Sequence, residues 1–595
     1  MVKSEIKKSL FKAIQSKKEW EEVNLASLRV EIKDNKEKNF GDFSTNIALI
    51  LAQKLKESPK KIADKLIKKF PPHPSIKKIE FSKPGFINFY LIDSHYSEIL
   101  KIIKKEKEKF GLNKTKDENK KILIEYVSSN PTGPLHVGHG RGAAFGSVLS
   151  NILRASGHKV DEEYYVNDQG RQIDILTLSV FLRCEQLLNN DFPYPKFCYQ
   201  GEYINSYAEQ IIESSKERGS KGEVFFIPVD KRKRLIEELK KIKKEEDLDV
   251  LISFARRNLE NKFIKVKEFV LEQIVHSIKL DLGKMGVNQN LWFTETKLYK
   301  SQNKKPSLID EVKNILERAK LTYEEGGALW FKSSQFKDDK DRVIEKENGQ
   351  TTYFASDIAY HAHKYGRGYD KIINVWGSDH HGYLPRVKSA MSALGLDPDK
   401  LEVIFIQFAT LIKENKKISM STRGGQFITL DELMKEVSPE ATRFFFINRK
   451  AEQHLSFDLD LAKKQSKDNP LYYIQYAHAR ICSILKNLEL TKRKVNSGLG
   501  EKNLNLLNGE KEEELLKILS KFPEVVLKSS DNYEPHLICY YLKDLSSSFH
   551  GYYNEEKILV DKEEELQAKI LLLQGVKQVI FNGLTLLGVS SPSSM

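Results

Sequence analysis

Two histidines three residues apart, His136 and His139, are the side chains whose type and spacing first suggest chemistry in this chain. They stand in the segment Pro134-Leu-His-Val-Gly-His-Gly140. A histidine ring can donate hydrogen bonds near neutral pH, and two such donors facing one point could hold a phosphate group. A turn whose histidines only cap a helix fits this segment equally well.

Three local elements must position these histidines. The apolar run 122–127 predicts a buried strand, and the Pro and Gly residues within 128–134 predict a turn. Apolar residues at helical spacing predict a helix over 140–154. A strand, a turn and a helix start together present backbone N–H groups and the positive end of the helix dipole to a phosphate.

Composition sets the class of protein. A chain of 595 residues suggests three to five domains, and 40% hydrophobic residues are enough for sizeable cores. The 97 basic and 83 acidic residues leave a net charge of +14, which permits a polyanionic partner without requiring one. Four widely spaced cysteines without a CxxC pair indicate free thiols in a reducing compartment. No signal peptide is visible and no apolar run approaches about 18 residues, so we expect a soluble, cytoplasmic protein.

A second set of strands is predicted later in the chain, beginning with 326–332 and 341–344, and these strands are expected to belong to the same sheet. The buried-strand pattern at 371–376 runs directly into Gly377-Ser-Asp-His-His-Gly382, and a further strand is predicted at 401–408. Strands that alternate with helices favour a parallel, doubly wound sheet, in which ligands bind beyond the carboxyl ends of the strands. We therefore expect the loops after Val127, Trp376 and Phe408 to meet.

Several motifs in this order resemble the arginyl-tRNA synthetases, a family of class I aminoacyl-tRNA synthetases. They are Asn39-Phe-Gly-Asp-Phe43, His136-Val-Gly-His139, Gly377-Ser-Asp-His-His381, Met420-Ser-Thr-Arg-Gly424 and Tyr472-Tyr-Ile-Gln-Tyr-Ala-His-Ala-Arg480. The resemblance implies ATP-dependent activation of arginine to arginyl-adenylate, followed by transfer to tRNA(Arg). It also implies Mg²⁺ brought by ATP, no other metal, no tightly bound cofactor and a monomer.

The resemblance assigns the nucleotide contacts. His136 and His139 would donate hydrogen bonds to the ATP phosphates, which is electrostatic catalysis without a covalent enzyme intermediate. The expected ATP-binding residues are Pro134, Leu135, Gly138, Gly140, Gly377, Asp379, His380, His381, Met420 and Ser421.

The same resemblance assigns the arginine contacts to Glu125, Ser128, Asn130, Tyr353 and Asp357. Tyr353 and Asp357 stand at i and i+4 and would grip the guanidinium, because carboxylates pair with it through two charge-assisted hydrogen bonds. The alternative is that Asp357 is only the N-cap of a helix.

The chain departs from the family pattern in one loop. Many class I enzymes carry Lys-Met-Ser-Lys-Ser there, but Ser419 and Thr422 stand at the two lysine positions. The candidates for the missing positive charge are Arg423, Lys416 and Lys417. For the two lysines, solvated loop charges are an equally good interpretation.

The resemblance divides the chain into three domains. Residues 1–115 would form an α/β or α+β domain that meets the tRNA elbow. Residues 116–455 would form the Rossmann-like catalytic domain, with helical insertions at about 195–285, and 456–595 a helical anticodon-binding domain. The expected tRNA contacts are Tyr473, Tyr476, Met595, Asn39 and Phe40. A tyrosine-lined helix core explains the two tyrosines as well as base stacking does.

Two rival functions remain open at this point. Another class I synthetase or a small nucleotidyltransferase would share the histidine motif, although a nucleotidyltransferase would not need the long helical C-terminal region. A non-catalytic tRNA-binding protein descended from a synthetase would explain the altered loop.

Overall fold

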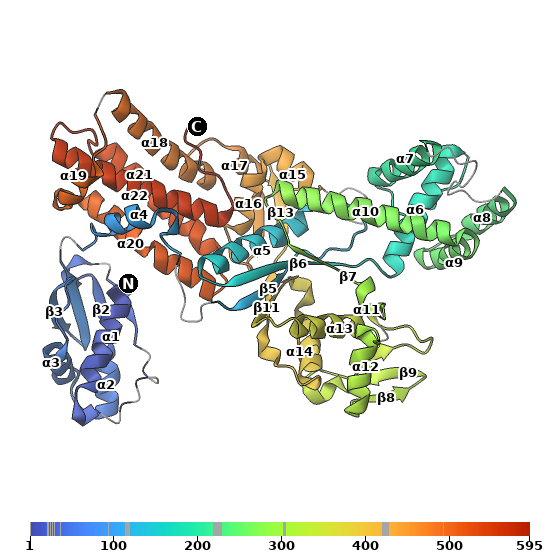
Figure 1. Ribbon diagram of the computed structural model, residues 1–595, viewed down its shortest axis with the longest axis horizontal. Coiled ribbons are helices and arrows are strands. Elements are labelled where there is room, and N and C mark those ends of the chain that lie inside the picture. Colours follow the sequence, from blue (N-terminus) through green and yellow to red (C-terminus); the bar gives the residue numbers. More distant parts are fainter. Residues whose placement is uncertain are drawn as a thin grey trace. The chain divides into compact units, whose positions relative to one another are not determined.

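The computed structural model describes the chain except residues 1, 21–22, 24, 26–27, 29, 36, 93–94, 113–118, 190, 218–228, 302–304, 419–427 and 492. The chain divides into two compact units (Figure 1). Unit 1 comprises Met1–Glu106, Thr491–Ser520 and Gly551–Gly575, and unit 2 comprises Lys107–Leu490, Lys521–His550 and Val576–Met595.

The N-terminal part of unit 1 is a small α+β fold. Its antiparallel sheet has the order β1 (Ile32–Asp34), β2 (Phe43–Thr45), β4 (Phe86–Leu91), β3 (Ile76–Ser82), and the helices α1 (Val2–Gln15), α2 (Ile47–Leu55) and α3 (Pro59–Lys69) pack against it. The helices α2 and α3 are separate, because Lys56 adopts a left-handed φ of 55° and Ser58 caps a new helix that starts at Pro59. A short helix, α4 (Ile99–Glu106), follows.

The centre of unit 2 is a five-stranded sheet in which all neighbours are parallel. Its order is β12 (Leu401–Ile406), β11 (Lys371–Gly377), β5 (Lys121–Glu125), β6 (Lys159–Val166), β7 (Leu291–Thr294). The chain order reverses between β5 and β11, which is the switch point of a doubly wound sheet. The helices α5 (Val137–Ala155), α13 (Tyr353–Gly366) and α14 (Leu384–Ala393) belong to this unit. The predicted doubly wound parallel sheet is confirmed.

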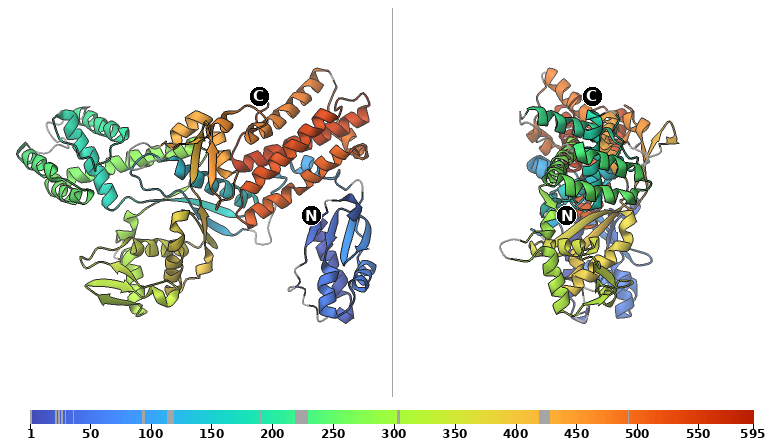
Figure 2. Two further views of the ribbon diagram at one scale, coloured as in Figure 1. Left: turned by 180° about the vertical axis from the view of Figure 1, so that it is seen from behind. Right: turned by 90° about the vertical axis from the view of Figure 1, so that its right-hand side faces the viewer.

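Two insertions interrupt the sheet. The first consists of α6 (Arg171–Leu188), α7 (Glu202–Glu217), α8 (Val229–Lys241), α9 (Leu248–Leu259) and α10 (Asn261–Lys284), and Figure 2 shows α6 and α10 carrying the other helices away from the sheet. The second contains α11 (Thr296–Tyr299), α12 (Leu308–Arg318), β8 (Thr322–Glu325), β9 (Ala328–Phe331) and β10 (Arg342–Glu345).

The second insertion corrects one expectation. The strand patterns at 326–332 and 341–344 are strands, but they form a separate antiparallel sheet of order β10-β9-β8 instead of joining the parallel one. Gly326 and Gly327, both at positive φ, make the tight turn between β8 and β9. A hydrophobic pattern predicts a strand without predicting its partner.

The remaining described elements complete the chain. Three short strands, β13 (Ala409–Lys413), β14 (Lys416–Lys417) and β15 (Leu455–Asp458), form a small sheet with α15 (Leu430–Val437), α16 (Pro439–Ile447) and α17 (Leu459–Lys463) nearby in sequence. The C-terminal region is helical as predicted, with α18 (Pro470–Leu490), α19 (Ser497–Lys502), α20 (Glu510–Asp531), α21 (His536–Glu555) and α22 (Glu563–Leu587). The four cysteines are free thiols.

One C-terminal helix corrects the expectation about apolar runs. By length and composition α22 could cross a membrane, although 67% of its most apolar stretch is buried within the protein. Leu572, Val576 and Ile580 have no exposed surface. A long apolar helix packed in a core has the same composition as a membrane span.

A buried arginine on α16 joins distant segments of unit 2. The Arg443 side chain is 1% exposed and donates to Ser147 Oγ (2.9 Å), Met285 O (3.0 Å) and Leu587 O (2.5 Å). Burial lowers its pKa to about 10, so the guanidinium remains charged at neutral pH. One side chain thus hydrogen-bonds to three segments that are far apart in the sequence.

Candidate active site

A pocket of about 640 Å³ opens beyond the carboxyl ends of β5, β11 and β12. The predicted residues that line it are Glu125, Ser128, Asn130, His136, Gly138, His139, Tyr353, Asp357, Gly377, Asp379 and His380. Gln407 and Phe408 from the loop after β12 complete that side. The prediction that these three loops meet at the switch point is confirmed.

The floor of the pocket bends sharply after β5. The strand ends at Glu125, two residues earlier than expected, because Val127 and Ser128 adopt φ values of 70° and 41°. The Ser128 hydroxyl donates to Glu125 Oε1 (2.8 Å) and accepts the backbone N–H of Tyr165 (3.1 Å). Left-handed backbone at a β-branched residue costs roughly 1–3 kcal/mol and concentrates at functional sites.

The two histidines stack at the start of α5. Their ring centroids are 3.6 Å apart, and His136 is the N-cap of the helix. His136 Nδ1 accepts the N–H of Gly138 (3.1 Å), and His139 Nδ1 accepts the N–H of His136 (3.3 Å). Because each Nδ1 is an acceptor, this geometry assigns the ring proton of each neutral histidine to Nε2. Helix capping and ligand binding are therefore compatible roles for the pair.

Both rings are uncharged donors at neutral pH. Burial lowers the pKa of His136, and burial together with the neighbouring His136 lowers the pKa of His139 to about 3. The pocket can therefore offer two N–H groups to a phosphate without changing its own protonation state.

The pocket that the histidines line also contains carboxyl groups. Enclosure by the pocket walls raises the pKa of Asp357 to about 7, the Tyr383 hydroxyl that donates to it opposes this rise, and the Glu125 and Glu295 carboxylates add to it. The N-cap of α13 is Thr352, whose hydroxyl accepts the N–H of Ala355, so the alternative that Asp357 only caps the helix is wrong. A carboxyl group held in this state is well suited to a cationic ligand.

Glu295 is a buried carboxylate next to the site that the sequence interpretation missed. It directly follows β7, is 4% exposed, and burial raises its pKa. The Tyr299 hydroxyl donates to Glu295 Oε1 (3.4 Å). The available signal was its position at the carboxyl end of a strand, where Glu125 and Gly377 also lie as the last residues of β5 and β11.

A buried lysine, Lys364, connects Glu125 of the pocket lining with Asn374. The sequence interpretation did not identify it. It has no exposed surface, pairs with Glu125, and donates to Asn374 Oδ1 (2.9 Å). Asn374 contacts His361 Nε2 (2.9 Å), and burial lowers the pKa of His361 to about 3. His361 is therefore a neutral member of this hydrogen-bonded cluster. The described residues contain no group of three or more His, Cys, Asp or Glu side chains that could hold a metal ion.

Replacing Lys364 with methionine is expected to destabilise unit 2 by about 3–5 kcal/mol, because the Glu125 carboxylate would stay buried without its cation. Urea unfolding followed by intrinsic fluorescence measures this loss. The matched change Lys371→Met breaks a partly exposed pair with Glu402 and should cost less than about 1 kcal/mol. Adding Glu125→Gln to Lys364→Met should restore part of the stability, and a double variant no more stable than the single one would contradict the argument.

Several predicted residues lie outside the lining of this pocket. Leu135 is buried and accepts the N–H of Leu430 (2.8 Å), and a Cβ at Gly140 would come within 2.7 Å of Leu430 and Phe446. Both residues therefore pack α5 against α15 and α16. His381 stacks on Phe405 with centroids 3.6 Å apart. Pro134 is also outside the lining.

The predicted loop charges divide into two groups. Lys416 and Lys417 form β14 and are exposed. Met420, Ser421 and Arg423 lie outside the described residues.

The predicted tRNA contacts occupy three places. Tyr473 and Tyr476 are half-buried on α18 with their rings 4.4 Å and 5.7 Å from that of His550, and the Arg480 guanidinium lies 4.5 Å from the Tyr476 ring. Met595 is 52% exposed. In unit 1, Asn39 and Phe40 belong to a 3-10 turn, and Phe40 is 46% exposed.

Three family models together match nearly the whole chain. The model of the class I (R) tRNA synthetase catalytic domain matches residues 99–191 and 227–465, the arginyl tRNA synthetase N-terminal domain matches 2–91, and the DALR anticodon binding domain matches 474–595.

Similar proteins and structures agree with these models. The arginine–tRNA ligase of Coxiella burnetii (strain RSA 493) is 43% identical over 569 residues, covering 95% of this chain and 94% of that protein. The ligase of Legionella pneumophila (strain Paris) is 43% identical over 577 residues, covering 96% and 95%. A putative arginyl-tRNA synthetase structure from Campylobacter jejuni covers 85% of this chain and all of its own at 32% identity and a TM-score of 0.71. The Thermus thermophilus enzyme, at 20% identity and a TM-score of 0.72 over all of both chains, shares the fold.

Proposed function

The chain belongs to the arginyl-tRNA synthetase family and attaches arginine to tRNA at the expense of ATP, and from this premise we propose how the pocket of unit 2 divides the work. The observation that carries the proposal is that two neutral N–H donors, His136 and His139, line the same pocket as the carboxyl group of Asp357. The buried Glu295 carboxylate, which raises the pKa of Asp357, lies close behind this lining. The histidines serve ATP, and the carboxylates serve arginine.

Arginine enters with its guanidinium toward Asp357, and Glu295 lies close enough to share the charge. A guanidinium fork can satisfy two carboxylate oxygens at once, whereas a lysine ammonium cannot, so lysine should be rejected. Glu125, Ser128 and Asn130 surround the backbone end of the amino acid. The side-chain amide of Asn130 donates to Gln172 Oε1 (2.9 Å), which fixes its orientation.

In the first step an arginine carboxylate oxygen attacks the α-phosphorus of ATP, and the bond to pyrophosphate breaks. The Nε2–H groups of His136 and His139 hydrogen-bond the phosphate oxygens as their charge increases. In the second step a hydroxyl of the terminal tRNA ribose attacks the arginyl carbonyl carbon and AMP leaves with the bonding electrons. Neither step requires the enzyme to form a covalent bond.

The nucleotide side is assigned to Gly138, Gly377, Asp379 and His380, which line the same pocket. Mg²⁺ accompanies ATP in this proposal, with the phosphates as its principal ligands. Tyr473, Tyr476 and Met595 would contact the anticodon, and Asn39 and Phe40 would contact the tRNA elbow. The three domains would be residues 1–115, 116–455 and 456–595. The enzyme would work as a monomer in the cytoplasm.

Arg423→Ala is expected to lower the rate of adenylate formation roughly tenfold or more, because the pyrophosphate would lose a transition-state donor. ATP–pyrophosphate exchange in the presence of tRNA measures the rate. The paired variant Lys416→Ala/Lys417→Ala serves as the comparison, since these exposed lysines on β14 are the other candidates. An unchanged rate in Arg423→Ala with a loss in the lysine variant would transfer the role to the lysines.

The deciding experiment is aminoacylation of tRNA(Arg) with each of the twenty amino acids, with and without His139→Ala. Charging with arginine alone, and its loss in the variant, supports the proposal. Charging with another amino acid would favour a different class I synthetase, and charging that survives the variant undiminished would remove the histidine from the mechanism. The C-terminal helices and the match to anticodon-binding domains already disfavour a small nucleotidyltransferase.

A further inference from the structure

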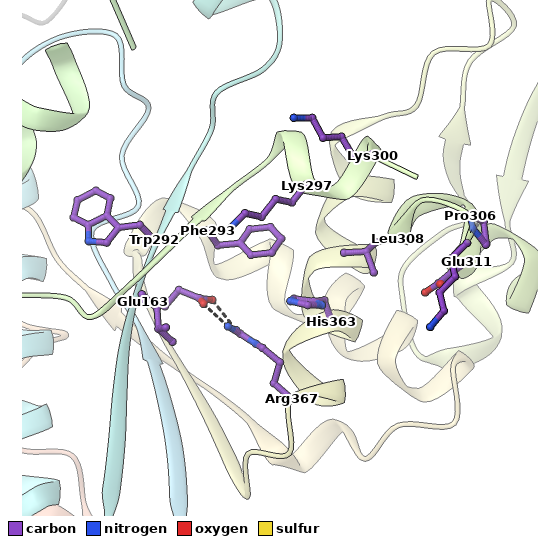
Figure 3. A pocket seen from close by; sticks show the side chains of 12 residues that line it. Glu163, Trp292, Phe293, Lys297, Lys300, Pro306, Leu308, Glu311, His363 and Arg367 are labelled. Atoms are coloured by element: carbon purple, nitrogen blue, oxygen red, sulfur yellow. Dashed lines mark hydrogen bonds and ion pairs between the residues drawn. The ribbon is translucent and has the colours of Figure 1, made fainter. Parts of the chain in front are cut away.

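A second cavity, separate in its lining from the active site, lies in unit 2 beside the edge strand β7. Its volume is about 360 Å³, and its walls come from β7, α11, α12 and α13 (Figure 3). The proposed function uses none of its lining residues. Its size falls at the low end of the roughly 300–1,000 Å³ of small-molecule sites, which suits a single small organic ligand.

The rim of this cavity is positively charged. Lys297, Lys300 and Lys305 are exposed, and within the described part of the chain no carboxylate lies within 4.0 Å of their ammonium groups. The other cation, Arg367, forms a two-bond pair with Glu163 (2.5 and 2.8 Å), visible in Figure 3. The lining contains four cations and two carboxylates, so its net charge is +2. Burial lowers the pKa of His363, so this histidine adds no charge at neutral pH.

The interior of the cavity is apolar. Leu291, Phe293 and Leu308 line it, and the Lys297 ammonium lies 5.5 Å from the centroid of the Phe293 ring. A site for an inorganic ion would not need this apolar wall, and a protein-docking surface would extend over a larger area than a pocket of this size. The combination suits a ligand with a negative head and a flat or apolar body.

We propose that this cavity binds the phosphate and base of one nucleotide. Lysine ammonium groups are compact point charges suited to a phosphate, and an apolar, aromatic wall suits a base, whose faces stack regardless of sequence. Two sources share this chemistry: a free nucleotide, or an unpaired nucleotide of the bound tRNA. The experiment below separates them.

The cavity shares a wall with the arginine site. Phe293 lies two residues before Glu295, and its ring centroid is 4.9 Å from that of Tyr360, which lines the active site. The Tyr360 hydroxyl donates to Glu163 Oε1 (2.7 Å), the carboxylate held by Arg367. A ligand seated here would therefore contact side chains that touch Tyr360, one wall of the active-site pocket.

Three variants test the proposal. Lys297→Ala/Lys300→Ala/Lys305→Ala removes the charged rim. Leu308→Trp fills the cavity and leaves every charge in place. The control Lys265→Ala/Lys340→Ala/Lys346→Ala removes the same charge from exposed positions outside the cavity. Near-normal arginine-dependent activity and an unchanged thermal midpoint establish that each variant is folded.

The first arm is calorimetric titration with cytidine 5′-monophosphate, and the second is the KM for tRNA(Arg) in aminoacylation. A free-nucleotide site predicts binding of the monophosphate that both cavity variants weaken tenfold or more and the control leaves intact. A site for a tRNA nucleotide predicts that the monophosphate does not bind. It also predicts that the KM for tRNA is at least fivefold higher in both cavity variants than in the control, while kcat is unchanged. If neither measurement separates the cavity variants from the control, the proposal is overturned.

Discussion

Asp357→Asn will lower kcat/KM for arginine by roughly a hundred- to several-thousand-fold, because the guanidinium would lose its charged partner in an enclosed site. The asparagine keeps the size of the side chain and can still accept the hydrogen bond from Tyr383, so the loss reports charge and not packing. Steady-state aminoacylation at varied arginine measures it. The matched change Asp399→Asn, at an exposed carboxylate, should leave kcat/KM unaltered.

The raised pKa of Asp357 gives this prediction a second readout. The ionised carboxylate binds the cation, and with a pKa of about 7 in the free enzyme a proton must leave when arginine binds below that pH. The KM for arginine should therefore be flat above about pH 7 and rise toward tenfold per unit as the pH falls below it. Tyr383→Phe removes a hydrogen bond that lowers this pKa, so the rise should begin at a higher pH. A pH-independent KM would contradict the assignment.

His139→Ala will lower the rate of adenylate formation by roughly 10²–10³, the usual loss when one preorganised donor to a developing charge is removed. The KM for arginine should stay within about twofold, because the proposal assigns this histidine to ATP and not to arginine. His139→Gln, whose amide can present an N–H near the position of Nε2, should recover part of the rate. Single-turnover formation of arginyl-adenylate measures the step directly.

Two results would contradict the role assigned to His139. One is a rate unaffected by the alanine change, and the other is an equal loss in the control His276→Ala, an exposed histidine on α10. The wild-type rate constant for this step should also show no inflection near pH 6.5, because the pKa of His139 is held at about 3 and the ring stays neutral. A clear inflection there would mean that a protonated histidine takes part.

The sequence predicted the sheet and the position of its ligand site because both follow from local signals. The strands that became β5, β11 and β12 are short apolar runs bounded by Gly or Pro, and the switch-point rule then places their loops together. His136 was singled out by its spacing from His139, whereas Asp357 and Asp379 were assigned through the resemblance to the family, and all three line the pocket. These features depend on residues within one helix turn or one loop of each other.

Glu295 and Lys364 were not predicted, because their roles depend on partners far away in the sequence. Lys364 pairs with a carboxylate 239 residues earlier, and nothing near either residue distinguishes it from the many solvated charges of this lysine-rich chain. The end of β5 was predicted two residues too late for a different reason. Val127 is a good strand former, and only the hydrogen bonds of Ser128 with Glu125 and Tyr165 make its left-handed backbone acceptable.

Because the chain is synthesised from its N-terminus, Arg443 is made before one of its hydrogen-bond acceptors exists. Its guanidinium needs the carbonyl of Leu587, which is synthesised 144 residues later. At ~5–20 residues per second, that interval is about 7–30 s, during which the buried charge lacks one of its acceptors. A polypeptide released before residue 587 would therefore carry a defect inside the catalytic unit itself. Shortened products of translation are expected to be degraded, rather than to persist as enzymes that merely bind tRNA poorly.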